Sequence, residues 1–272
     1  MMELKSISQR VKDLRKELRT LPFKEDDIRV EFLNFLGMAY YNFYRGHVVL
    51  DLSNCIDRNE IQPSEVARNE LGDHIKAITM LSQEPVLEKE YLSSLNRNLL
   101  IGAWSNFELC VTILCEAVCK EDELEKLLSY QYREICKKLK KSELDPDDVE
   151  QLKGLTYKHH LTHIPVTRKT DLLFKKVSGY KREQNEDKEF LKFVGKLRNT
   201  MHTNFIYYGK DYNFVFNQDQ FSFKNGETVV VLSSFDPYLY LSLINELKEI
   251  WIALIKTISY TDIISYPDKN TP

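Results

Sequence analysis

Apolar residues recur every three or four positions along most of this 272-residue chain. That spacing puts side chains on one face of an α-helix, because the helix completes a turn every 3.6 residues. The first such segment runs from Leu4 to Leu21 and is followed by Pro22, a residue that interrupts helical hydrogen bonding. Strand-like alternation is confined to short runs after residue 211. The sequence therefore predicts a mainly α fold.

Helix-start signals divide the first half of the chain. Acidic residues at 26–27 are suited to open a second helix, which we expect to reach about Ile56. The sequence Pro63-Ser64-Glu65 predicts a third helix that extends to about Ser82. Apolar residues then surround most of the segment 86–120. A helix that is apolar nearly all round is buried, so this one is predicted to be central to the core.

The following segments carry more charge and more breakers. A charged helix is predicted over 121–141, and a short helix over 170–177 that ends at Gly179. Asn185 is expected to cap the next helix, which has an amphipathic pattern up to about residue 202.

Aromatic and β-branched residues alternate in the segments 212–216, 220–223 and 229–232. Asn225-Gly226 is a strong hairpin-turn signal, because both residue types tolerate positive φ. Asp236-Pro237 then opens a last apolar helix.

The predicted fold class is a mainly α helical bundle with a small antiparallel β-hairpin or meander inserted before the last helix. A single mostly helical domain over 1–272 is the simplest organisation, because we find no repeat and no low-complexity linker. A separable N-terminal helical subregion over 1–84 is the alternative.

Charge and composition restrict the class of function. The formal net charge is −3, so nucleic-acid binding would require a local basic patch. We find no apolar run of the ~18–20 residues that a membrane span needs, and the N-terminus lacks a signal-peptide pattern. A cytoplasmic protein that does not bind membranes is predicted. The chain has five cysteines and no C-x-x-C pair, which favours free thiols in a reducing compartment.

Cofactor and metal motifs are missing from the sequence. With nine glycines and no glycine-rich phosphate loop, no cofactor is predicted. His159, His160 and His163 have ligand-like spacing, but Pro165 follows closely and no cysteine lies nearby. An exposed loop is the preferred interpretation, and no metal site is predicted.

The main candidate site is the sequence Leu197-Arg198-Asn199-Thr200-Met201-His202-Thr203-Asn204. Residues four apart on a helix are one turn apart on the same face, so Arg198 and His202 are neighbours. A guanidinium can bind phosphate oxygens through two hydrogen bonds. Histidine titrates near neutral pH and can move a proton to or from a ribose oxygen. Asn199 is assigned to orient these groups, and Asn204 to bind substrate.

A basic segment precedes this site. Residues 133–182 contain 13 Lys and Arg against seven Asp and Glu. Such a segment could steer RNA electrostatically toward Arg198, whereas a solvated helix face explains any single cluster equally well. The substrate-binding lysines predicted from these clusters are Lys137, Lys138, Lys140, Lys141, Lys175 and Lys176.

The R-N-x-x-H motif at Arg198, Asn199 and His202, between an amphipathic helix and an aromatic hairpin, resembles the HEPN superfamily. The resemblance extends in helix order over about 86–262 and is closest to uncharacterised bacterial members with a compact motif. It implies an all-α fold, a homodimer, RNA binding and metal-independent ribonuclease activity in toxins or phage defence. The catalytic residues that it implies are Arg198, His202 and Asn199.

Two other interpretations stay open at this stage. The arginine-to-histidine spacing is shorter than in the active nucleases, so the alternative is a catalytically silent helical interaction or dimerisation module. In that case Arg198 and His202 would complement the helix C-terminus, or Arg198 would pair with Glu108. The aromatic residues of the hairpin are expected to pack against the helices rather than to stack on bases.

Overall fold

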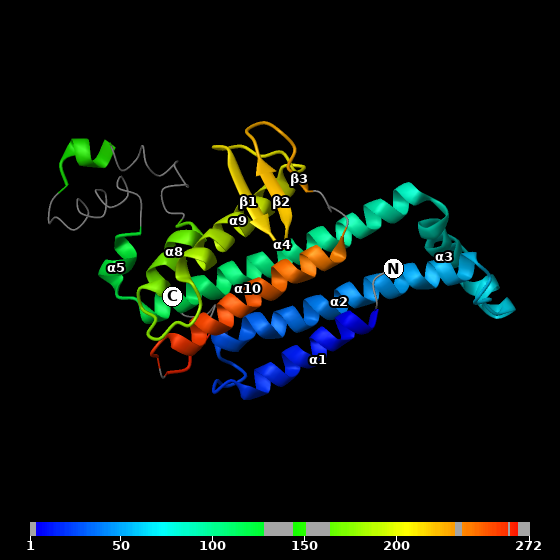
Figure 1. The fold of residues 1–272 in the computed structure, drawn as a ribbon, viewed down its shortest axis with the longest axis horizontal. Helices are drawn as coiled ribbons and strands as arrows, with labels where there is room; N and C mark the ends of the chain where they lie inside the picture. The colour runs from blue at the N-terminus through cyan, green and yellow to red at the C-terminus, as the bar shows by residue number, and fades with distance from the viewer. Residues whose placement is uncertain (1–3, 128–143, 151–163, 232–235, 261, 266–272) are drawn as a thin grey trace.

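The computed structural model describes residues 4–127, 144–150, 164–231, 236–260 and 262–265, with the side chains of residues 4, 5, 230 and 231 excepted. It is mainly helical, with a small antiparallel sheet before the last helix (Figure 1), as the sequence predicted. Four long helices lie side by side, and the sheet lies above them near α9 (Gln184–His202) (Figure 1). These four helices are α1 (Leu4–Thr20), α2 (Ile28–Asp57), α4 (Pro85–Val118) and α10 (Pro237–Thr257).

The predicted capping residues begin three of the helices. The Asp27 side chain accepts a hydrogen bond from the backbone N–H of Arg29 at the start of α2. Ser64 does the same for Ala67 in α3 (Glu65–Gln83). Asp236 caps α10, where Pro237 occupies the first turn. Each cap satisfies a backbone donor that has no intrahelical partner.

Apolar side chains of α1, α2, α4 and α10, together with those of α8, α9 and the sheet, form one continuous core. At its centre the rings of Phe32, Phe107 and Trp251 meet edge to face, with centroids 5.6–5.9 Å apart. α4 packs against five other helices, namely α2, α3, α8, α9 and α10, which confirms its predicted central place. The helix α3 has no buried residue and projects from one end of the bundle (Figure 1).

The helix α4 is the one described segment that meets the length and composition criteria for a membrane span. The sequence analysis excluded a membrane span because no uninterrupted apolar run is long enough. An 18-residue window of α4 that contains at most two charged residues is nevertheless apolar enough. In the structure 56% of that window is buried inside the protein, as in the core helix of a helical bundle. It is therefore weak evidence for a span.

The sheet has the order β1-β2-β3 and is antiparallel throughout. Its strands are β1 (Tyr212–Phe216), β2 (Asp219–Phe223) and β3 (Val230–Val231). The tight turn between β1 and β2 is formed by Asn217 and Gln218, both with positive φ. The predicted turn at Asn225-Gly226 instead connects β2 to β3, and there only Gly226 has positive φ. The sequence signal marked a real turn, but not the tight hairpin.

Three predicted helix boundaries were wrong. In place of the first turns of the charged helix, α5 covers only Glu121–Glu125 and residues 126–127 form a turn, while the rest of that predicted helix lies outside the described residues. The short helix α8 begins earlier than expected, at Val166, and ends at Phe174. The helix α9 (Gln184–His202) begins after Glu183, so Asn185 lies inside its first turn and does not cap it.

The described cysteines Cys55, Cys110, Cys115 and Cys119 are free, and the last three are buried. This agrees with the predicted core role. Burial raises the pKa of both Cys110 and Cys115 to about 12.

Candidate functional site

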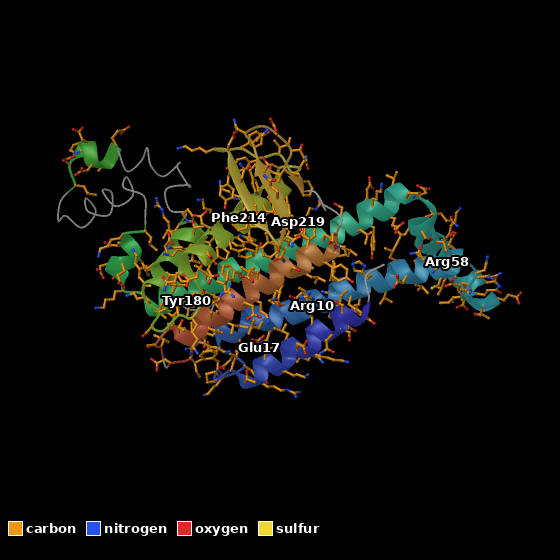
Figure 2. All side chains as sticks on the ribbon, viewed as in Figure 1. Arg10, Glu17, Arg58, Tyr180, Phe214 and Asp219 are labelled. Carbon is orange, nitrogen blue, oxygen red and sulfur yellow. The ribbon has the colours of Figure 1, made fainter. Side chains whose placement is uncertain are left out.

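The helix α9 carries the candidate site and is fixed at both of its ends. Near its start, the buried carboxylate of Asp187 accepts hydrogen bonds from Tyr180 (2.5 Å) and Arg182 (2.8 Å). Arg182 also pairs with Glu246 of α10, and Figure 2 labels Tyr180 at this end of the bundle. Burial and the hydrogen bond to Asp187 raise the pKa of Tyr180, which keeps its hydroxyl a donor.

A close approach between α9 and α4 positions the second half of α9. A Cβ atom on Gly195 would lie 3.1 Å from Cζ2 of the buried Trp104. On the side that faces the sheet, Phe193 stacks on Phe214 with centroids 4.3 Å apart. Figure 2 labels Phe214 on the strand above the helices. The hairpin aromatics therefore pack on α9, as expected from the sequence.

A groove of about 800 Å3 lies between α4, α8 and α9. That volume is within the range typical of ligand sites. Trp104 and Glu108 contribute from α4, and Thr170 and Asp171 from α8. The α9 residues that line it are Lys188, Glu189, Lys192, Gly195, Lys196, Arg198 and Asn199.

Charge is distributed unevenly along this groove. Lys188 lies 3.5 Å from Asp171, and Lys192 lies 3.2 Å from Glu189. Lys196 instead donates to the hydroxyl of Tyr207 at 2.6 Å, which is an uncharged partner. Lysines at positions 188, 192 and 196 are one turn apart, so they form a row along one face of α9. Positive charge without a carboxylate partner is therefore concentrated toward the C-terminal end of α9.

Arg198 lies at that end. Its Nη1 donates to Oδ1 of Asn199 at 3.1 Å, and its Nε is buried without a hydrogen-bond partner. Glu108 lines the same groove, yet among the ion pairs of the described residues none joins it to Arg198. The predicted Glu108–Arg198 pair is therefore not formed. Arg198 thus lines the groove without a carboxylate partner among the described residues.

His202 is placed differently from Arg198. It is exposed and does not line the groove, although it follows Arg198 by one helical turn. Within the described part of the chain, it has no hydrogen-bond or ion-pair partner. Asn204 is exposed beyond the helix end with a φ of +53°. The structure thus brings Arg198 and Asn199 into one groove and leaves His202 and Asn204 outside it.

The predicted substrate-binding lysines are not assembled at this groove. Lys137, Lys138, Lys140 and Lys141 lie outside the described residues, as do the three histidines at 159–163. Lys175 is exposed and does not line the groove. Lys176 is held by both carboxylate oxygens of Glu123, each at 2.7 Å, and these hydrogen bonds raise the pKa of Lys176.

The sequence analysis missed Lys188, Lys192 and Lys196. Their spacing of four residues was visible in the sequence and places them on one helix face. The consecutive basic residues from which the lysine site was predicted point in different directions on a helix and do not form such a row.

Comparisons of the chain with protein-family models, with curated proteins and with solved structures find no match.

Proposed function

We propose that the protein binds the phosphate backbone of single-stranded RNA in the α4–α8–α9 groove, through Lys196 and Arg198. The observation that carries the proposal is the arginine at the C-terminal end of the groove, with a buried Nε that has no hydrogen-bond partner. A guanidinium next to a lysine that lacks a carboxylate partner favours a ligand with negatively charged oxygens. Lys192 and Lys188, one and two turns before Lys196, continue the same row along α9.

In the same proposal, the protein is a HEPN-like, metal-independent endoribonuclease that acts as a cytoplasmic homodimer in a toxin or phage-defence setting. A histidine base removes the proton of the ribose 2′-hydroxyl, whose oxygen attacks the phosphorus. The bond to the 5′-oxygen breaks, and a protonated histidine donates the proton that this oxygen needs. Arg198 stabilises the additional negative charge. Because His202 is outside the groove, the proposal assigns it to a phosphate bound at the groove of a second copy.

A second candidate function follows from the exposure of His202. A histidine that faces solvent without an orienting partner is poorly suited to catalysis. The alternative is therefore a catalytically silent helical module that binds RNA or a protein partner without turnover.

The test uses the full chain with a fluorescent single-stranded RNA of about 20 nucleotides, in EDTA. Binding is measured by anisotropy and cleavage by gel. We expect Arg198→Gln to weaken binding at least about tenfold, with a shallower salt dependence, and His202→Ala to keep binding and lose cleavage. Lys175→Gln, which removes an exposed cation outside the groove, is the matched control.

The outcomes separate the candidates. If the wild type does not bind RNA, or binds it as well after Arg198→Gln, the phosphate-binding proposal is wrong. If RNA is bound but never cleaved, or is cleaved equally by His202→Ala, the catalytic part is wrong and the silent module is favoured.

A further inference from the structure

A second, smaller pocket lies between α1, α2 and α10. Its volume is about 370 Å3, which is sufficient for a small organic molecule. None of its residues lines the groove of α9. The polar side chains that line it and bear on its chemistry are Gln9, Arg10, Asp13, Tyr40, Asn245 and Lys248.

The hydroxyl of Tyr40 is the most informative group in this pocket. The side chain is only 2% exposed, and no described residue makes a hydrogen bond to its hydroxyl. Because Tyr40 lines the pocket, a hydroxyl without a partner among the described residues is available to a ligand there. Burial also raises the pKa of Tyr40 well above its usual range. The hydroxyl therefore remains protonated and can donate a hydrogen bond into the pocket.

Arg10 supplies a positive charge close to that hydroxyl. Its charge acts electrostatically on Tyr40 and partly offsets the effect of burial on the pKa. Among the ion pairs of the described residues, none involves Arg10. Figure 2 shows Arg10 and Glu17 on the same helix, α1; Glu17 is directed to a different cation, Lys248.

The other charged side chains at the pocket already have partners of opposite charge. The ammonium of Lys248 lies 2.7 Å from both Glu17 and Glu249. Asp13 accepts a hydrogen bond from Gln9 at 2.8 Å and lies 3.8 Å from Lys16. Arg10 is therefore the cation at this pocket for which no described residue supplies a carboxylate partner. A single positive charge matches a monoanion better than a dianion.

We propose that this pocket binds a small polar monocarboxylate. In this assignment the carboxylate accepts hydrogen bonds from the Arg10 guanidinium and the Tyr40 hydroxyl. The side-chain amide of Asn245, which can donate and accept, is available for a neutral polar group of the ligand. The site is independent of the RNA proposal, since it shares no residue with the groove of α9.

The experiment is ligand-observed NMR on the full chain with three sets of probes. The first set contains small monocarboxylates, including lactate, gluconate and N-acetylglycine. The second contains the corresponding primary amides, which keep the shape and lose the charge, and the third contains glucose 6-phosphate and inorganic phosphate. We expect at least one monocarboxylate to bind with a dissociation constant of about 1 mM or tighter, and its amide to bind at least about tenfold more weakly.

Two variants test the assigned residues. Tyr40→Phe removes only the hydroxyl, and Arg10→Gln removes the charge. Each is expected to weaken monocarboxylate binding at least about tenfold, whereas Arg15→Gln, on the exposed side of α1, leaves binding unchanged. Circular dichroism checks the fold of each variant. Because no described residue makes a hydrogen bond to the Tyr40 hydroxyl, Tyr40→Phe keeps the test valid even if Arg10→Gln unfolds.

The proposal is overturned by any of three results. These are no monocarboxylate binding in the first set, equal binding of the acid and its amide, or unchanged binding in Tyr40→Phe. Tighter binding of the phosphates than of every monocarboxylate would overturn the charge argument and with it the assigned ligand class.

Discussion

The ammonium of Lys196 donates a 2.6 Å hydrogen bond to the hydroxyl of Tyr207, and this hydroxyl donates in turn to the backbone carbonyl of Lys210 at 2.8 Å. These two hydrogen bonds therefore link the groove-lining face of α9 to the loop that precedes the sheet. Gly209 makes room for them, since a Cβ there would lie 2.6 Å from the Tyr207 hydroxyl. The orientation of Lys196 in the groove thus depends on a residue 11 positions later.

The first prediction concerns Tyr207. In Tyr207→Phe, Lys196 loses its acceptor and the Lys210 carbonyl loses its donor, so the free energy of unfolding should fall by about 1–2 kcal/mol. Urea denaturation followed by circular dichroism measures this difference. Tyr208, which is 68% exposed, is the matched control, and Tyr208→Phe should change nothing. Equal effects in the two variants would show that the hydrogen-bond chain does not contribute to stability.

The second prediction compares two helical glycines. At Gly195 an added methyl would press on the ring of Trp104 at 3.1 Å, whereas at Gly72 no atom lies within 4 Å of the added Cβ. Gly72→Ala should therefore stabilise the protein by about 0.5–1 kcal/mol, the usual gain of alanine in a helix. Gly195→Ala should lose that gain and destabilise the protein, because Trp104 is buried and cannot move away freely. Thermal denaturation of both variants checks the difference in sign.

The parts of the fold that the sequence predicted well depend on local signals. Asp27, Ser64 and Asp236 cap helices because a short acceptor side chain satisfies the first backbone donors, whatever surrounds it. The tight hairpin was placed wrongly for the opposite reason. Asn217 and Gln218 adopt positive φ because the register of Phe214 against Phe221 fixes the turn length, and that constraint is tertiary.

The candidate site was predicted only in part. The face shared by Arg198 and His202 follows from helix geometry, but which of them meets a groove depends on α4 and α8. Trp104 and Asp171 are 67 residues apart and converge on α9 only in the folded protein. No spacing rule in a single sequence gives that convergence, so the location of His202 outside the groove could not be foreseen.

The third prediction concerns a buried ion pair at the start of α2. Arg29 is 3% exposed, and its Nη2 lies 2.6 Å from Oδ2 of Asp27 and also donates to the backbone carbonyl of Asp262. Its Nη1 donates to the backbone carbonyl of Tyr260. Arg29→Met would leave the Asp27 carboxylate buried without its cation and would release the segment after α10. We expect a loss of about 3–5 kcal/mol in the free energy of unfolding.

Guanidinium denaturation measures that loss, and the double variant Asp27→Asn with Arg29→Met is the informative control. It removes the buried charge as well, so it should be more stable than Arg29→Met alone. Because asparagine also caps helices, a double variant that is less stable than the single one would mean that the Asp27 carboxylate is not destabilised by the loss of Arg29.

The fourth prediction concerns pH and His47. This residue is 7% exposed, it contacts Phe43 edge to face, and its Nε2 has no hydrogen-bond partner. Burial lowers the pKa of His47 below 6.5, and the charge of Asp51 only partly opposes this shift. Below pH 6.5 the unfolded chain binds the proton of this histidine more readily than the folded protein does. The free energy of unfolding therefore decreases as the pH falls from 6.5 toward the folded-state pKa, and above pH 6.5 this loss is absent. Urea midpoints at pH 7.5 and 5.5 should therefore differ more for the wild type than for His47→Leu. His74→Gln, at an exposed position of α3, should keep the wild-type difference; if it reduces the difference as much as His47→Leu does, burial of His47 is not the cause.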